Sequence, residues 1–182
     1  MKKGLKTGII FEANMVGTLF HPASQAARVL YGLVVSRARH SIFYTRFGVA
    51  DTVDGRFDMI VLHAFLLLRR LGQEGAGLAQ ALFDEMFSDM DSNLREMGVS
   101  DLRVGSQVND MVKAFYGRVS VYDTALASPD NQLLAAALWR NVYRGAASQR
   151  EQVHELVIYV REVAARLATL SIDNLSFGAL PE

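Results

Sequence analysis

Residues 78–98 read LAQALFDEMFSDMDSNLREMG, and this stretch decides the fold class. At about 100° per residue, its large apolar side chains fall within roughly 100° of arc on a helix. These side chains are Phe83, Met86, Phe87, Met90, Leu94 and Met97. Acidic and polar residues fill the remaining arc, and Gly98 occupies the position of a left-handed C-terminal cap. The stretch therefore predicts an amphipathic helix whose apolar stripe is either a core face or a groove for another helix.

The same helical periodicity recurs on both sides of this stretch. It predicts helices after His21-Pro22-Ala23-Ser24, from about Asp54 to Leu71, from Val108 to Leu126, after Ser128-Pro129-Asp130, and over about 153–167. The period is lost around 41–48, and residues 48–52 are expected to form a loop. Because no segment shows a convincing strand pattern, the sequence predicts an all-α, single-domain bundle of about six helices.

Length and composition limit the chemistry of the chain. It has 182 residues, 51% of them hydrophobic, and no cysteine. This composition supports one packed domain and excludes disulfides, thiolate metal sites and cysteine nucleophiles. Glu151-x-x-His154 is half of a di-iron motif whose second copy the sequence lacks. We therefore expect no catalytic residue, cofactor or metal, and we expect His63, in an apolar stretch, to be buried and hydrogen-bonded.

Charge is balanced in total and uneven along the chain. Nineteen basic and 19 acidic residues give a net charge of zero, which argues against nucleic-acid specificity. Residues 1–46 carry seven Lys/Arg against Glu12 alone, whereas residues 51–101 carry ten Asp/Glu against four Arg. The acids of the opening stretch lie on its outer arc, so they form either a solvated face or a docking surface for a basic partner.

The ends of the chain are expected to be peripheral. The apolar run at 8–11 is interrupted by Glu12, whereas a signal sequence needs about 7–15 apolar residues. The longest apolar stretch, 59–68, is shorter than the roughly 18–20 residues of a membrane span. The expected organisation is a basic N-terminal arm (1–22), a helical domain (23–170) and a C-terminal tail (171–182).

Three blocks carry a family resemblance. They are GVADTVDGRFDMIVLHAFLLLRRL at 48–71, LFDEMFSDMDSNLREMGVSDLRVGSQVNDMVKAFYGR at 82–118, and ALWRNVYRG at 137–145. Together, in order over about residues 25–145, they resemble the ubiquinol–cytochrome c chaperone family. The resemblance implies a non-enzymatic helical chaperone that holds newly made cytochrome b until the ubiquinol–cytochrome c reductase (bc1) complex is assembled. Residues 23–170 are then the chaperone domain.

The resemblance also implies partners and a location. Mitochondrial members work at the inner membrane with a small partner subunit and the ribosome exit region. The short form of this chain is similar to alphaproteobacterial members, which implies a cytoplasmic protein with peripheral contact at the cytoplasmic face of the inner membrane.

Residues of three kinds within these blocks are candidate partner contacts. The loop and helix start offer Asp51, Asp54, Arg56 and Phe57, the acidic face offers Asp89, Asp91 and Arg95, and the end of the second block offers Tyr116, Gly117 and Arg118. Thr52 or Asp54 can cap the helix that begins here, and Arg56 either pairs with Asp54 or Asp58 or reaches a partner. Glycine inside a helix costs about 1 kcal/mol relative to alanine, so we expect another helix to approach Gly117 closely.

Two other classes of function remain open. An enzyme of quinone or haem metabolism on a helical scaffold predicts bound cofactor or metal in the purified protein. A membrane-surface adaptor using Lys2, Lys3 and Lys6 predicts salt-sensitive liposome binding that is lost when these lysines are neutralised.

Overall fold

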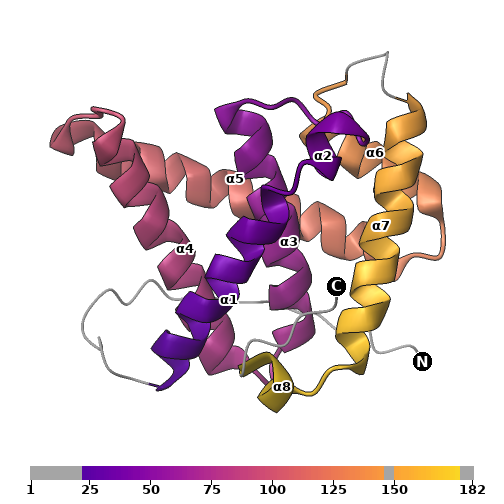
Figure 1. The fold of residues 1–182 in the computed structure, drawn as a ribbon, viewed down its shortest axis with the longest axis horizontal. Coiled ribbons are helices and arrows are strands. Elements are labelled where there is room, and N and C mark those ends of the chain that lie inside the picture. The colour runs from indigo at the N-terminus through magenta and orange to yellow at the C-terminus, as the bar shows by residue number, and fades with distance from the viewer. Residues whose placement is uncertain (1–21, 146–149, 177–182) are drawn as a thin grey trace, which may run out of the picture.

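The computed structural model describes residues 22–145 and 150–176, and within them the chain is all α-helix (Figure 1). The helices are α1 (Pro22–Ala38), α2 (Ile42–Thr45), α3 (Val53–Leu71), α4 (Ala76–Glu96), α5 (Asp101–Ala127), α6 (Asn131–Asn141), α7 (Arg150–Thr169) and α8 (Ile172–Ser176). The six long helices are the six that the periodicity predicts, which confirms the all-α, single-domain fold. The expected N-terminal arm lies outside the described residues, except for Pro22, which is the first residue of α1.

Helix α3 is the centre of the bundle and packs against α1, α4, α5 and α7 (Figure 1). Of its 19 residues 13 are buried, including every residue from Met59 to Leu68. Neighbouring helices cover α3 on several sides, and a helix that is apolar all round belongs in a core.

The loop before α3 is fixed to the first turn of the helix. The hydroxyl of Thr52 accepts a hydrogen bond from the Gly55 amide at 3.1 Å, which confirms Thr52 as one of the two predicted caps. A Cβ added at Gly55 would lie 1.9 Å from the carbonyl oxygen of Ala50. The backbone of the loop therefore lies directly against α3, and only glycine permits this approach.

Helices α4 and α5 form a hairpin whose joined ends lie away from α3, at the upper left of Figure 1. Gly98 adopts a φ of 83°, as predicted for the cap after α4. The apolar stripe of α4 is a core face over most of its length, since Phe83, Met86, Phe87 and Met90 are buried. Near the turn it emerges from the core, because Met97 is 64% exposed.

Three segments differ from the predicted helix boundaries. Helix α5 begins at Asp101, seven residues before Val108. The segment 101–107 was missed because it is exposed except for the buried Val104 and the half-buried Gln107, so it has no apolar stripe to recognise. The short helix α2 lies where the periodicity was lost, and it is anchored by the buried Phe43. The short helix α8 occupies part of the expected tail, where Leu175 is buried in the core.

Candidate functional site

A buried aspartate links the start of α3 to two distant segments. Asp58 has no solvent exposure, and its two carboxylate oxygens contact Arg118 of α5 at 2.8 Å and Arg144, just after α6, at 3.1 Å. Arg144 also pairs with Asp54 at 3.3 Å. The Arg118 guanidinium lies 5.7 Å from the ring centroid of Phe57. The structure thus brings together three predicted site residues, Asp54, Phe57 and Arg118, around Asp58 and Arg144, which were not predicted as site residues.

The electrostatics of this cluster are set by burial. Desolvation raises the pKa of Asp58 to about 6, although Arg118 and Arg144 both act to lower it. Arg144 has a φ of 52°, which costs a non-glycine residue roughly 1–3 kcal/mol. Its contacts with the two carboxylates offset that strain. Arg118, with its side chain 17% exposed, holds α5 against α3, and its contact with a partner stays a prediction.

Arg56 forms an ion pair outside the buried cluster. Its Nε donates to Asp51 Oδ1 at 2.7 Å, so the expected pairing with Asp54 or Asp58 is wrong. The reason is the close approach of the loop to Gly55, which brings Asp51 beside the first turn of α3. The hydrogen bond from Arg56 lowers the pKa of Asp51 below its usual value. This pair lines one side of a polar cleft of about 260 Å³.

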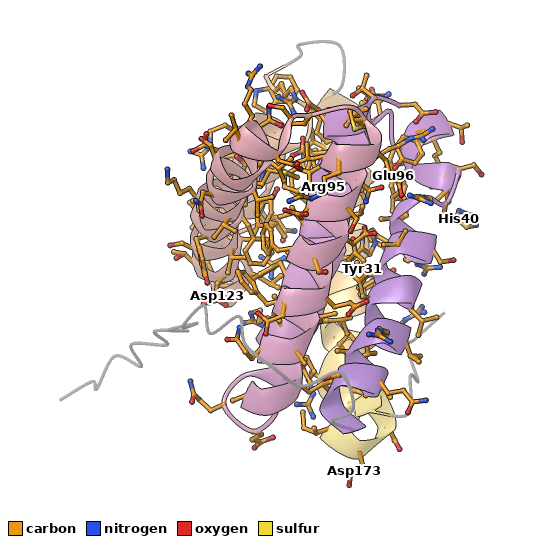
Figure 2. All side chains as sticks on the ribbon, turned by 90° about the vertical axis from the view of Figure 1, so that its left-hand side faces the viewer. Tyr31, His40, Arg95, Glu96, Asp123 and Asp173 are labelled. Carbon is orange, nitrogen blue, oxygen red and sulfur yellow. The ribbon has the colours of Figure 1, made fainter. Side chains whose placement is uncertain are left out.

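The predicted acidic face of α4 is partly occupied by contacts within the protein. Asp89 accepts a 2.6 Å hydrogen bond from the hydroxyl of Tyr31, which ties α4 to α1. Figure 2 shows Tyr31 between these helices and Arg95 closer to the hairpin end of α4. Arg95 pairs with Asp91 at 2.5 Å and also contacts Asp101 at the start of α5. Asp91 and Arg95 are therefore part of a surface ion-pair group at the hairpin end, and a role for them in partner binding stays a prediction.

Tyr116 and Gly117 lie in different environments although they are adjacent. The Tyr116 ring is half-buried, with its centroid 5.7 Å from that of Phe83 and 5.8 Å from that of Phe115. Gly117 is exposed, and apart from its own stretch of helix no described atom lies within 4 Å of a Cβ built on it. The expectation that another helix of the domain approaches Gly117 is therefore wrong for the described residues. No packing contact among the described residues explains why a glycine, with its low helix propensity, occupies this position.

His63 is a buried, hydrogen-bonded residue, as predicted. Its Nδ1 lies 2.7 Å from the carbonyl oxygen of Met59, and its Nε2 lies 2.7 Å from the hydroxyl of Tyr159. Because a carbonyl only accepts, Nδ1 carries the proton and Nε2 accepts from Tyr159. Arg37 in turn donates to the Tyr159 oxygen at 3.3 Å. Desolvation lowers the pKa of His63 to about 4, so this chain of hydrogen bonds holds a neutral imidazole.

Within residues 22–145 and 150–176, no three histidine, aspartate or glutamate side chains gather in a way that could hold a metal ion. None of the helices described there has both the length and the hydropathy needed to cross a bilayer.

The geometry defines a class of protein: an all-α domain with ion pairs around its central helix and a protruding hairpin. The family described as "Ubiquinol-cytochrome C chaperone" matches residues 45–180, from the end of α2 through α8. The chain therefore belongs to the ubiquinol–cytochrome c chaperone family, which confirms the family predicted from the three sequence blocks. The match also extends past residue 145, where the predicted resemblance ended.

Named relatives agree with this family. The chain is 30% identical over 153 residues to the Xenopus laevis "Ubiquinol-cytochrome-c reductase complex assembly factor 1", covering 82% of this chain and 76% of the relative. The human protein of that name is 28% identical over 180 residues, covering 96% and 60% respectively. "Protein CBP3, mitochondrial" of Saccharomyces cerevisiae is 32% identical over 135 residues, covering 71% and 39%. The chain thus spans only part of several relatives.

A solved structure has the same fold. The crystal structure described as that of the Cbp3 homolog from Brucella abortus is 35% identical in sequence and superposes with a TM-score of 0.77. The alignment covers 87% of this chain and 89% of that one, so the similarity includes nearly the whole described bundle.

Proposed function

We propose that this protein is a non-enzymatic assembly chaperone of the ubiquinol–cytochrome c reductase (bc1) complex that binds newly made cytochrome b. The observation that carries the proposal is the chaperone-family match over residues 45–180. Relatives from Xenopus and human, similar over most of this chain, are named as assembly factors of that complex. On this proposal the protein acts at the cytoplasmic face of the inner membrane, in peripheral contact with it, and a small partner subunit and the ribosome exit region are further partners.

The surface proposed to contact the client is the outward face of α5. Exposed residues recur along it at helical spacing: Leu102, Ser106, Asp110, Lys113 and Gly117. Leu102 is 96% exposed at the hairpin end, and Gly117 has open space around it. An exposed apolar side chain offers hydrophobic contact, and a glycine lets the backbone of a client helix come close.

Five of the other predicted contact residues have supporting positions in this proposal. Asp54, Phe57 and Arg118 belong to the cluster around Asp58 that fixes α5 on α3, so they set the orientation of the client face. Asp91 and Arg95 lie beside the exposed hairpin end and supply polar contacts around Leu102.

Gene deletion tests the proposed function. We expect the level of cytochrome b, measured by immunoblot, and the amount of assembled bc1 complex to fall in the deletion strain and to recover with the wild-type gene. Normal assembly in the deletion strain would overturn the proposal. The purified protein is expected to show no haem, flavin or quinone absorption, and a stoichiometric bound cofactor would favour an enzyme instead.

Two glycine variants test the client face separately. Gly117→Leu places a large side chain on the α5 face, and we expect it to fold but to fail to restore cytochrome b levels. Gly32→Leu is the matched control, because Gly32 also lies inside a helix, is exposed and has no described atom within 4 Å of a built Cβ. Full rescue by both variants would exclude the α5 face as the client surface while leaving the proposed function intact.

A further inference from the structure

The polar cleft beside α2 is built from three separate segments. Arg39 follows the end of α1, Ser41, Tyr44 and Thr45 belong to α2 and its first turn, and Asp51 and Arg56 flank the start of α3. The walls are fixed by contacts of their own. The hydroxyl of Tyr44 donates to the Ala38 carbonyl at 2.7 Å, and the hydroxyl of Thr45 donates to the Ser41 carbonyl at 3.0 Å. These hydrogen bonds hold α2 against the end of α1 and fix the cleft walls.

Positive charge exceeds negative charge in this cleft. Two guanidinium groups, of Arg39 and Arg56, face one carboxylate, of Asp51. Arg39 makes no ion pair within residues 22–145 and 150–176. Asp51 engages Arg56 through Nε, which leaves the two Nη groups outside that hydrogen bond. The sequence from 22 to 50 contains no acidic residue, so α1 and α2 supply no carboxylate to the cleft.

We propose that this cleft binds a phosphate group. A tetrahedral phosphate has enough oxygens to contact both guanidinium groups and a hydroxyl such as that of Ser41, whereas a planar carboxylate is satisfied by one guanidinium fork. The volume of about 260 Å³ accommodates a phosphate ester and is smaller than most sites for larger ligands. The inference rests on the chemistry of the cleft and does not depend on the proposed chaperone function.

Titration of the whole protein with inorganic phosphate tests the site. We expect saturable shifts of the backbone amide NMR signals of Ser41 and Thr45. The variant Arg39→Gln should bind phosphate about tenfold more weakly, and the double variant Arg39→Gln/Arg56→Gln more weakly still. Asp51→Asn should bind more tightly, because it removes the competing carboxylate. Arg103→Gln removes an exposed arginine elsewhere and serves as the matched control.

Vesicles distinguish the two sources of such a phosphate. The same variants are sedimented with phosphatidylcholine vesicles that contain or lack phosphatidylglycerol. Loss of phosphatidylglycerol binding in the variants that lose inorganic phosphate supports a lipid headgroup as the ligand. Unchanged vesicle binding together with lost inorganic phosphate binding supports a free phosphate compound.

Three results would overturn the inference. The first is the absence of saturable shifts in the wild-type protein together with vesicle binding by the double variant equal to that of the wild type. The second is weaker phosphate binding by Asp51→Asn, and the third is a loss of phosphate binding in Arg103→Gln equal to that in Arg39→Gln, which would show unspecific charge attraction. Circular dichroism checks that the variants fold. If the double variant does not fold, the single variant Arg39→Gln decides the test. It is expected to fold because Arg39 has no ion pair to lose in the described part of the chain.

Discussion

Gly55 and Gly117 are glycines of the two long family-like blocks, and they occupy opposite environments. A Cβ at Gly55 would collide with the Ala50 carbonyl oxygen at 1.9 Å, whereas a Cβ at Gly117 would meet no described atom within 4 Å outside its own stretch of helix. Gly55 is thus required by the fold. Gly117 lowers the stability of α5, and no packing contact inside the described domain requires a glycine there. This is the property expected of a surface kept free for a partner.

The same substitution should therefore change stability in opposite directions at these two positions. We expect Gly55→Ala to lower the free energy of unfolding by about 1–3 kcal/mol, because the loop or the helix must shift. Gly117→Ala should raise it by up to about 1 kcal/mol through helix propensity. Urea denaturation measures both values. A loss of stability in Gly117→Ala would show that the open face of α5 is constrained after all.

Residue-level predictions from the sequence succeeded where the cause is local. The Thr52 cap and the Gly98 turn depend on a few neighbouring residues, and both are present. The partners of Asp58 could not be predicted in this way, since Arg118 and Arg144 are 60 and 86 residues away in sequence. The pairing of Arg56 was predicted wrongly because only the folded loop brings Asp51 beside it.

Helix α3 is the element that buries two titratable side chains, Asp58 and His63, and they respond to pH in opposite directions. Burial raises the pKa of Asp58 to about 6, so its contribution to stability is complete below its usual pKa of 3.8 and is lost as the pH rises through about 6. Burial lowers the pKa of His63 to about 4, so its contribution is complete above its usual pKa of 6.5 and is lost as the pH falls toward about 4. The two effects oppose each other between about pH 4 and pH 6.

Asp58→Asn should expose the effect of His63. We expect the free energy of unfolding of this variant to fall more steeply on acidification from about pH 6 to about pH 4 than that of the wild type, with a difference of up to about 3 kcal/mol across the window. The asparagine still offers a hydrogen-bond acceptor to Arg118, which favours a folded variant. Denaturant unfolding at several pH values measures the two slopes, and parallel curves would contradict the prediction.

At the scale of elements, periodicity predicted the long helices because their apolar residues face the core. It failed for the first turns of α5, where the hairpin lies away from α3 and the residues at 102, 103, 105 and 106 are exposed, Gly105 having no side chain at all. It also failed to show that α3 is covered on several sides, because periodicity within one helix carries no information about the number of its neighbours.

At the scale of the molecule, the two opposed charge blocks of the sequence meet in space. Helix α1 packs along α4, with Arg28 lying 3.5 Å from Glu85 and Tyr31 bonded to Asp89. The acidic face of α4 is thus partly neutralised by α1. Among the described residues of the basic block, Arg37, Arg39 and Arg46 lie at or beyond the other end of α1, and Arg39 lines the phosphate-binding cleft that we propose.

The α4–α5 hairpin end is the part of the described molecule that exposes its most accessible large apolar side chain, Leu102. Because this side chain is 96% exposed, Leu102→Ser should change the free energy of unfolding by less than about 0.5 kcal/mol. If the hairpin end binds an apolar client segment, the same variant should recover less cytochrome b when tagged protein is purified from cells. Leu133→Ser is the matched control, since Leu133 is an exposed leucine on α6, 49% accessible and outside the proposed face. Recovery of cytochrome b by Leu102→Ser at the wild-type level would show that Leu102 has no part in client binding, and an equal loss in both variants would indicate a general effect of surface hydrophobicity instead of a specific contact.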